Sequence, residues 1–200
     1  MGGDVNWTQF TEFTASAILR ELCATYSTKE YSVVEADVQR HFFAHLETAV
    51  TSDPEACLPV RGAQEIFTKV RHAGWTPAIA TGGWRRAAEF KLATAGIATH
   101  GIPMVTSSEH ERRTDIIRGA VRLATEGAEP RQVVYVGDGS WDVRASRDLG
   151  IGFVGRASAH RAPQLFGLGA SAVVPDFADA DELIALLSES RSLVPSADAG

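Results

Sequence analysis

The pattern of apolar and polar positions changes character near residue 58. Before it, apolar residues recur at helical spacing through two stretches, 8–26 and 33–50, which predicts two amphipathic helices. No strand pattern precedes them, so we expect an antiparallel pair of helices packed on each other. The Pro and Gly of Leu58–Gly62 predict a linker that ends this helical unit.

After the linker, short apolar runs alternate with helical stripes. The expected strands cover residues 76–81, 102–105, 132–136, 151–154 and 172–174. The expected helices cover residues 63–72, 84–95, 112–125, 140–149, 162–168 and 179–187. Such alternation predicts an α/β fold, a three-layer Rossmann-like parallel sheet with helices on both faces. The expected division is a helical unit at 1–57, an α/β core at 58–188 and a frayed tail at 189–200.

The strand expected at 132–136 leads into the most informative loop. Its valine-rich run is typical of a strand buried on both faces, and Gly137 permits a tight turn after it. Asp138 then lies at the carboxyl end of the strand, and Asp142 lies in the first turn of the next helix. Two carboxylates that close repel unless a cation or a proton separates them, and Mg²⁺ commonly binds one or two carboxylates plus phosphate. The alternative is that Asp138 is only a turn residue and that Asp142 only complements the helix dipole.

Two other loops carry residues suited to an anion. Thr81, Gly82 and Gly83 follow an apolar strand and precede a helix, so their hydroxyl and N–H groups could bind a phosphate. Arg112 and Arg113 open a later helix, where a cation opposes the helix dipole and an anionic ligand would offset the cost. The alternative for residues 81–83 is an ordinary turn between a strand and a helix. The alternative for Arg112 and Arg113 is a solvated pair at the surface.

Composition narrows the classes of partner. The formal net charge of −6 argues against nucleic acid as the main partner. Two cysteines, Cys23 and Cys57, are too few for a disulfide framework and indicate free thiols in a reducing compartment. We find neither a signal peptide nor an apolar run of the ~20 residues that a membrane span needs, so we expect a cytoplasmic protein without a membrane partner. His41 and His45 share a helix face, but a zinc site there is less favoured than exposed helix residues.

Together these motifs resemble the haloacid dehalogenase superfamily, most of whose members are Mg²⁺-dependent phosphatases, and within it the phosphoglycolate-phosphatase-like type. Thr81 matches the family's Ser or Thr after the second strand, and Arg113 (less closely Arg112) matches its basic residue at a later helix start. Asp138 and Asp142 match its Gly-Asp followed by a second Asp. The resemblance covers 59–177 by motif, and residues 8–52 by position and helical character, as a helical cap.

The resemblance implies a role for each of these residues. Thr81 and Arg113 would be catalytic, with Thr81, Gly82 and Gly83 binding the phosphate of a small phosphorylated metabolite. The metal ligands for Mg²⁺ would be Asp138 and Asp142.

One family motif is missing from the sequence. The family begins with an apolar strand that ends in Asp-x-Asp-Gly-Thr and supplies the nucleophile. The nearest candidate here is Asp4-Val5-Asn6-Trp7-Thr8, which lacks the apolar strand, the second carboxylate and the Gly-Thr, so we do not assign Asp4 as nucleophile. The missing strand would lie between those at 76–81 and 132–136.

Three explanations are open for the missing motif. Either the chain is an N-terminally truncated form of a longer protein, or the two flanking strands pair directly, or a partner supplies a strand. We favour truncation, and we expect the chain as given to be inactive. The alternative function is a non-catalytic relative, a regulatory module that binds phosphate and metal.

Overall fold

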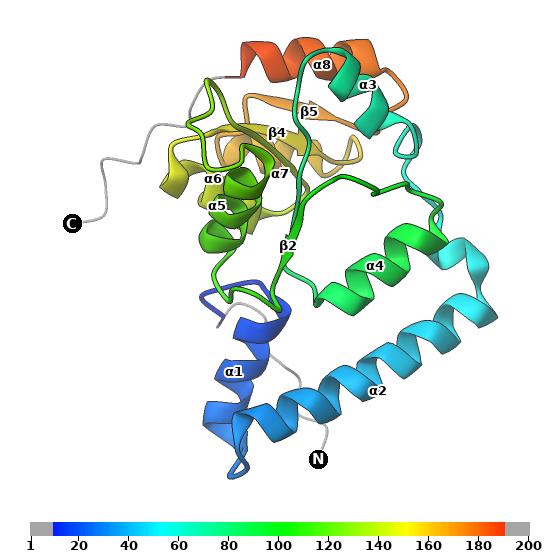
Figure 1. Ribbon diagram of the computed structural model, residues 1–200, viewed down its shortest axis with the longest axis vertical. Coiled ribbons are helices and arrows are strands. Elements are labelled where there is room, and N and C mark those ends of the chain that lie inside the picture. Colours follow the sequence, from blue (N-terminus) through cyan, green and yellow to red (C-terminus); the bar gives the residue numbers. More distant parts are fainter. Residues whose placement is uncertain (1–9, 191–200) are drawn as a thin grey trace.

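The computed structural model describes residues 10–190 and begins with two helices that project from an α/β body (Figure 1). They are α1 (Ala15–Tyr26) and α2 (Tyr31–Ser52), followed by the short 3-10 helix η2 (Pro54–Cys57). Thr14 caps α1, because its side chain accepts the N–H of Ala17. The predicted start at residue 8 lies outside the described residues, and residues 10–14 precede the helix instead of belonging to it.

The expected alternation of strands and helices is confirmed downstream. The strands are β1 (Ile79–Thr81), β2 (Met104–Thr106), β3 (Val134–Gly137), β4 (Gly152–Arg156) and β5 (Ala172–Val174). The helices are α3 (Ile66–His72), α4 (Arg85–Thr94), α5 (Arg113–Ala124), α6 (Ser140–Leu149), α7 (Ala162–Gly167) and α8 (Ala180–Glu189). Every strand pair is parallel, so the α/β fold class is confirmed.

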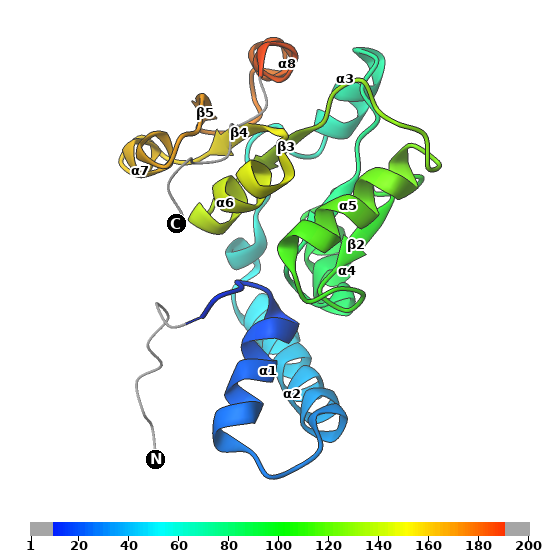
Figure 2. The same ribbon diagram turned by 90° about the vertical axis from the view of Figure 1, so that its left-hand side faces the viewer.

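Helices cover both faces of the β3–β4–β5 part of the body. One core joins α3 and α8 to the strands through buried residues such as Val70, Leu183 and Val154. The other joins α6 and α7 to the opposite face through Val143, Leu165 and Phe153. Phe153 and Val154 have no exposed surface, as expected when side chains alternate between two covered faces. The result is the three-layer arrangement that the pattern predicts (Figure 2).

The sheet is divided between β1 and β3, the place where the sequence analysis expects a strand to be missing. β1 pairs with β2, and β3 pairs with β4 and β5, but no pairing joins β1 to β3 in the described part of the chain. A side chain links them instead: the Tyr135 hydroxyl donates to the Ala80 carbonyl across 3.2 Å. The explanation in which the flanking strands pair directly is therefore wrong for this structure.

Four of the five expected strands have different bounds in the structure, and two of these differences have identifiable reasons. β1 begins at Ile79 rather than residue 76, after Pro77, which has no N–H to donate to a neighbouring strand. β4 continues to Arg156 rather than ending at residue 154, because Arg156 pairs with Val174 of β5. That second difference matters for the site, since it adds a cation to the carboxyl edge of the sheet.

The two N-terminal helices contact each other, and α2 also contacts α4 of the body. α2 buries Phe43 alone among its residues, and Phe43 meets Phe90 of α4 with ring centroids 5.4 Å apart. Phe42 belongs to the apolar stripe of the stretch 33–50 but is 42% exposed. A helix selects its buried face by the surface it reaches, and α2 reaches α4 as well as α1. The sequence pattern alone does not show that surface.

Candidate active site

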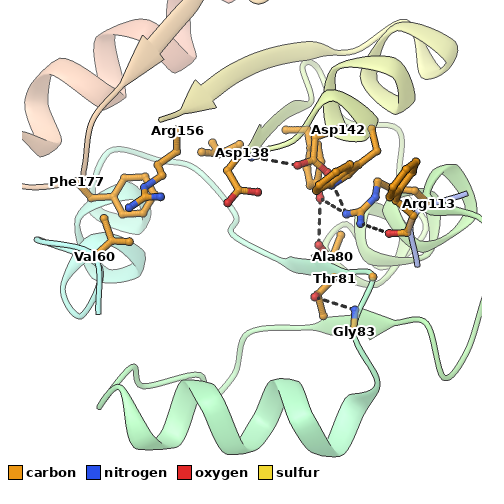
Figure 3. Close-up of a pocket in the computed structure, with 15 residues that line it drawn as sticks. Val60, Ala80, Thr81, Gly83, Arg113, Asp138, Asp142, Arg156 and Phe177 are labelled. Atoms are coloured by element: carbon orange, nitrogen blue, oxygen red, sulfur yellow. Dashed lines mark hydrogen bonds and ion pairs between the residues drawn. The ribbon is translucent and has the colours of Figure 1, made fainter. Parts of the chain in front are cut away.

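A cavity of about 510 Å³ opens at the carboxyl ends of β1, β3 and β4. Its lining includes Thr81, Gly82 and Gly83 from the first loop and Arg113 from α5. Asp138 and Asp142 line it from the third loop, so all the predicted site residues meet at one edge of the body (Figure 3). Open α/β folds place ligands at this edge. Whether each residue has its predicted role stays a prediction.

Asp138 directs its carboxylate into the cavity (Figure 3). We find no hydrogen bond or ion pair to that carboxylate in residues 10–190. Gly137 lets Asp142 pack closely against the end of β3, because a Cβ at residue 137 would lie 2.6 Å from Oδ2 of Asp142. A larger residue at 137 would therefore displace the Asp142 carboxylate.

Asp142 is buried and already has partners within the protein. Its Oδ2 accepts the N–H groups of Asp138 and Gly139, each across 3.0 Å, which caps α6. Its Oδ1 lies 3.0 Å from Nη1 of Arg113 but makes no hydrogen bond. Burial raises the pKa of Asp142, and the Arg113 charge and the N–H donors offset only part of that rise. Oδ2 of Asp142 therefore interacts with the start of α6, as in the alternative interpretation, whereas Oδ1 faces Arg113.

Arg113 is the basic residue that enters the cavity. Its Nη2 donates to the Phe13 carbonyl across 2.8 Å, and its Nη1 donates to the Tyr135 hydroxyl across 3.3 Å. Arg112 lies at the surface, 3.7 Å from a carboxylate oxygen of Glu12 and 67% exposed. Of the two arginines that the sequence left open, the structure brings Arg113 to the other site residues.

The loop after β1 is tied down on both sides. The Thr81 hydroxyl oxygen accepts the N–H of Gly83 across 3.3 Å, and the Gly82 carbonyl accepts the N–H of Ala15 across 2.7 Å. A Cβ at Gly82 would lie 2.5 Å from Nη2 of Arg113, so a larger residue here would displace the guanidinium. The Thr81 hydroxyl hydrogen can still be donated to an anion in the cavity.

Among the lining residues that the sequence analysis did not identify, three bear on the chemistry or shape of the cavity. Arg156 faces the cavity from the end of β4, and its Nε is buried without a hydrogen-bond partner. Tyr135 points into the space between β1 and β3, and burial raises the pKa of its hydroxyl. Phe13 stacks on Trp141 at the cavity wall, with ring centroids 5.0 Å apart. Continuing the strand at 151–154 through Gly155 would have placed Arg156 level with Asp138.

The oxygen donors suit Mg²⁺ better than zinc. Asp138 offers an open carboxylate, and Oδ1 of Asp142 makes no hydrogen bond but is paired with the Arg113 charge. No group of three or more His, Cys, Asp and Glu side chains able to hold a metal occurs in residues 10–190. A hard cation held by two carboxylates, with water and phosphate as its other ligands, fits that set. His41 and His45 are exposed on α2 and gain no third ligand.

A family comparison agrees with this arrangement. The family model of haloacid dehalogenase-like hydrolases matches residues 5–156. The chain belongs to the haloacid dehalogenase-like hydrolase family. The match begins well before the motif-based resemblance at residue 59 and includes α1 and α2. Residues 5–9 of this match lie outside the described residues, as does Asp4.

Family membership leaves the finer predictions open. No curated protein matches the chain, so the phosphoglycolate-phosphatase-like type and the loss of the first motif stay predictions. The division into a helical cap and a core also stays a prediction. Among the helices in residues 10–190, none has the length and apolar character to cross a membrane.

Proposed function

We propose that this haloacid dehalogenase-like hydrolase is built as a Mg²⁺-dependent phosphatase for a small phosphorylated metabolite. One observation carries the proposal: an anion-binding loop, a buried arginine and two carboxylates line the same cavity. Such a set holds a phosphate and a divalent cation side by side. The family provides the reaction class, and the cavity provides the residues.

The proposed roles of the residues follow from their charge and hydrogen-bonding groups. The Thr81 hydroxyl and the N–H groups of Gly82 and Gly83 bind phosphoryl oxygens, and Arg113 stabilises the negative charge that develops during transfer. Asp138 and Asp142 would hold Mg²⁺, which would supply neutralisation of phosphate charge and polarisation of the phosphoryl group. Arg113 sits beside Asp142, so its charge is balanced until an anion enters.

The chain as given lacks an assigned nucleophile, and we propose that it is an N-terminally truncated, inactive form. The carboxylates lining the cavity within residues 10–190 are Asp138 and Asp142, and both belong to the cation site. A third carboxylate is needed to attack phosphorus and form the aspartyl phosphate that water then hydrolyses.

Truncation makes a prediction about the coding sequence. The codons directly upstream of Met1 should encode an apolar strand ending in Asp-x-Asp-Gly-Thr, because the family's nucleophile motif has that form. Sequencing the locus in the same frame checks this. An in-frame stop codon with no such motif would exclude truncation.

Ligand binding tests the site without requiring turnover. We expect Mg²⁺ with inorganic phosphate to raise the melting temperature of the 200-residue chain. Asp138→Asn should weaken that stabilisation by at least on the order of 10-fold in Mg²⁺ concentration, a change typical even of residues that only support metal ligands. Asp148→Asn is the matched control, because Asp148 is an exposed acid on α6.

The outcomes separate the proposals. Equal stabilisation of the wild type and Asp138→Asn, or none of either, would reject the phosphate-and-cation site. Mg²⁺-dependent hydrolysis of an aryl phosphate by the 200-residue chain, lost in Asp138→Asn, would show that the chain is not inactive. Binding without turnover after the missing motif is restored would favour the alternative, a non-catalytic phosphate- and metal-binding module.

A further inference from the structure

Arg156 lines the site cavity, but the roles proposed above do not use it. It ends β4 one residue beyond Gly155, which pairs with Gly137 of β3, so it lies level with Asp138. Its Nε is buried without a partner, and we find no hydrogen bond or ion pair to its guanidinium within residues 10–190. A buried N–H group without an acceptor is costly. The arrangement therefore points to a ligand that supplies the acceptor.

The carboxylates that line the cavity in residues 10–190 do not neutralise Arg156. Asp142 lies 3.0 Å from Nη1 of Arg113, so those two charges balance each other. Asp138 also lines the cavity, but it forms no ion pair with Arg156, and its carboxylate is the one proposed to face the cation. Arg156 therefore offers a positive charge for an anionic group of the ligand.

Arg156 lies away from the loop that is proposed to bind the phosphoryl group. β4 pairs with β3 on one side and with β5 on the other, so β1 is not its neighbour. Adjacent strands are about 4.8 Å apart, which puts the ends of β4 and β1 at least about 10 Å apart. In Figure 3, Asp138 lies between Arg156 and Arg113, and the Arg156 side chain points toward Phe177. Arg156 therefore faces a different part of the ligand from the phosphoryl group.

The space beside Arg156 has two apolar walls that are fixed in place. Val60 and Phe177 line the cavity there (Figure 3). The Phe177 N–H donates to the Arg61 carbonyl across 2.8 Å. Gly62 approaches so closely that a Cβ would lie 2.0 Å from the Phe177 carbonyl oxygen, and its φ of 75° also favours glycine. We call the space between Val60, Arg156 and Phe177 the Arg156 subsite; its walls are held before any ligand binds.

We propose that Arg156 binds a second anionic group of the substrate, so that the substrate is a phosphate ester whose other end is a carboxylate or a second phosphate. Both groups present two oxygens to the fork of a guanidinium. The carbon skeleton between the two anions lies against Val60 and Phe177. The proposal rests on the proposed function, because it takes the phosphoryl group to bind near Thr81 and Arg113. Arg156 then determines specificity by contacting the leaving group.

Paired ligands test the proposal on the 200-residue chain without turnover, because phosphonates have a C–P bond that a phosphatase does not hydrolyse. Propyl, butyl and pentyl phosphonate are each compared with the analogue that carries a carboxylate, or a second phosphonate, in place of the terminal methyl group. Titration calorimetry at a fixed, saturating Mg²⁺ concentration gives each dissociation constant. We expect the best dianionic ligand to bind at least on the order of 10-fold more tightly than its alkyl partner, because charge-assisted hydrogen bonds are strong. The terminal group that gains more identifies the second anion.

Three variants assign the preference to a residue. Arg156→Met removes the charge and should abolish the preference while the alkyl phosphonates bind as before. Arg156→Lys keeps the charge without the planar fork and should keep part of the preference. Arg161→Met is the matched control, because Arg161 is exposed, does not line the cavity and donates to the Asp138 carbonyl across 3.4 Å. It removes the same charge from the same edge of the sheet and should leave the preference intact.

Thermal unfolding separates ligand binding from a structural role. Arg156→Met removes a buried N–H that has no partner, so the melting temperature without ligand should not fall. A fall, together with an unchanged preference, would assign Arg156 to the fold and overturn the proposal.

The binding results distinguish failure of this proposal from failure of the proposed function. No binding of any phosphonate in the presence of Mg²⁺ would reject the proposed function, and this proposal with it. Binding of alkyl phosphonates with no gain from a second anion would reject this proposal alone. A preference that survives Arg156→Met would do the same. Equal loss of the preference in Arg161→Met would also reject it, because that would show general attraction by positive charge rather than contact with Arg156.

Discussion

At the scale of single residues, Arg113 has more structural consequences than any other residue of the site. Its guanidinium contacts the Phe13 carbonyl, the Tyr135 hydroxyl and the Asp142 carboxylate. These partners come from the N-terminal segment, from β3 and from α6. Arg113 therefore both prepares a positive site for an anion and connects parts of the chain that are distant in sequence.

Removing the Arg113 charge should destabilise the fold. Arg113→Met leaves the buried Asp142 carboxylate without its cation, and breaking such a pair costs about 3–5 kcal/mol. Arg113→Lys keeps the charge but loses the planar geometry, so its cost should be smaller. Urea unfolding measures both. Arg112→Met is the control, with an expected change of less than about 0.5 kcal/mol because Arg112 is exposed; equal losses for the two Met variants would contradict the assignment.

Glu109 gives a prediction about pH. Burial alone would raise its pKa, but hydrogen bonds from Arg85 and Thr106 together lower it below the ordinary value. A lowered pKa in the folded state stabilises the protein above the unfolded pKa, and that stability is lost as the pH falls through the folded pKa. The stability difference between wild type and Glu109→Gln should therefore shrink as the pH falls below about 4.

The size of the Glu109 effect is limited by solvent. Its side chain is 36% exposed, so the difference at neutral pH should be no more than about 1 kcal/mol. Urea unfolding of both proteins across this pH range gives the comparison. A difference that stays constant with pH would show that Glu109 contributes through packing rather than charge.

At the scale of elements, the start of α1 joins the N-terminal helices to the body. The buried Thr14 hydroxyl accepts the Ala17 N–H and donates to the Glu111 carbonyl across 2.5 Å. The Ser16 hydroxyl donates to the Ser107 carbonyl across 2.8 Å and accepts from Trp84 across 3.0 Å. These bonds hold α1 against the loop that leads to Arg113, so the helix cap and the site depend on the same contacts.

Thr14→Ala tests that junction. It removes the N-cap and leaves the Glu111 carbonyl without this donor, so we expect a loss of about 1–2 kcal/mol in the free energy of unfolding. The matched control is Thr48→Ala in α2, where the exposed hydroxyl only donates to the Ala44 carbonyl of its own helix. A loss at Thr48 as large as that at Thr14 would indicate a general effect of threonine rather than the cap.

At the scale of the whole molecule, the divided sheet separates two halves. β4 is paired on both sides and its central residues Phe153 and Val154 are fully buried. β1 is paired on one side and packs through small alanines against a core that includes Val105 and Ile116. In the described part of the chain no strand pairing connects the halves, so their local stabilities can differ.

Amide hydrogen exchange of the protein should reveal that difference in local stability. We expect the amides of β4 to exchange at least on the order of 10-fold more slowly than those of β1, because opening β4 breaks two ladders and two cores. Mass spectrometry of peptides covering 152–156 and 79–81 measures this. Equal protection would show that the two halves unfold as one cooperative unit despite the divided sheet.

The local sequence determined the elements and the loops that carry the site. Valine-rich runs, glycine turns and helical stripes are short-range patterns, so Ser140–Leu149 and Ala172–Val174 were predicted with their observed bounds. The α/β class followed from their order. The loops that follow β1 and β3 begin near Thr81 and Asp138. They meet because parallel strands end at one edge of the sheet.

Tertiary structure alone decided which surfaces meet. Arg156 lies at the cavity because its pairing with β5 extends β4 to that point. Arg113, rather than Arg112, lies in the site because its guanidinium bonds to Phe13 and Tyr135. The buried face of α2 and the division of the sheet between β1 and β3 likewise depend on residues distant in the chain. Hydrophobic burial is non-directional, so a sequence pattern shows that a face is to be covered, while the fold determines what covers it.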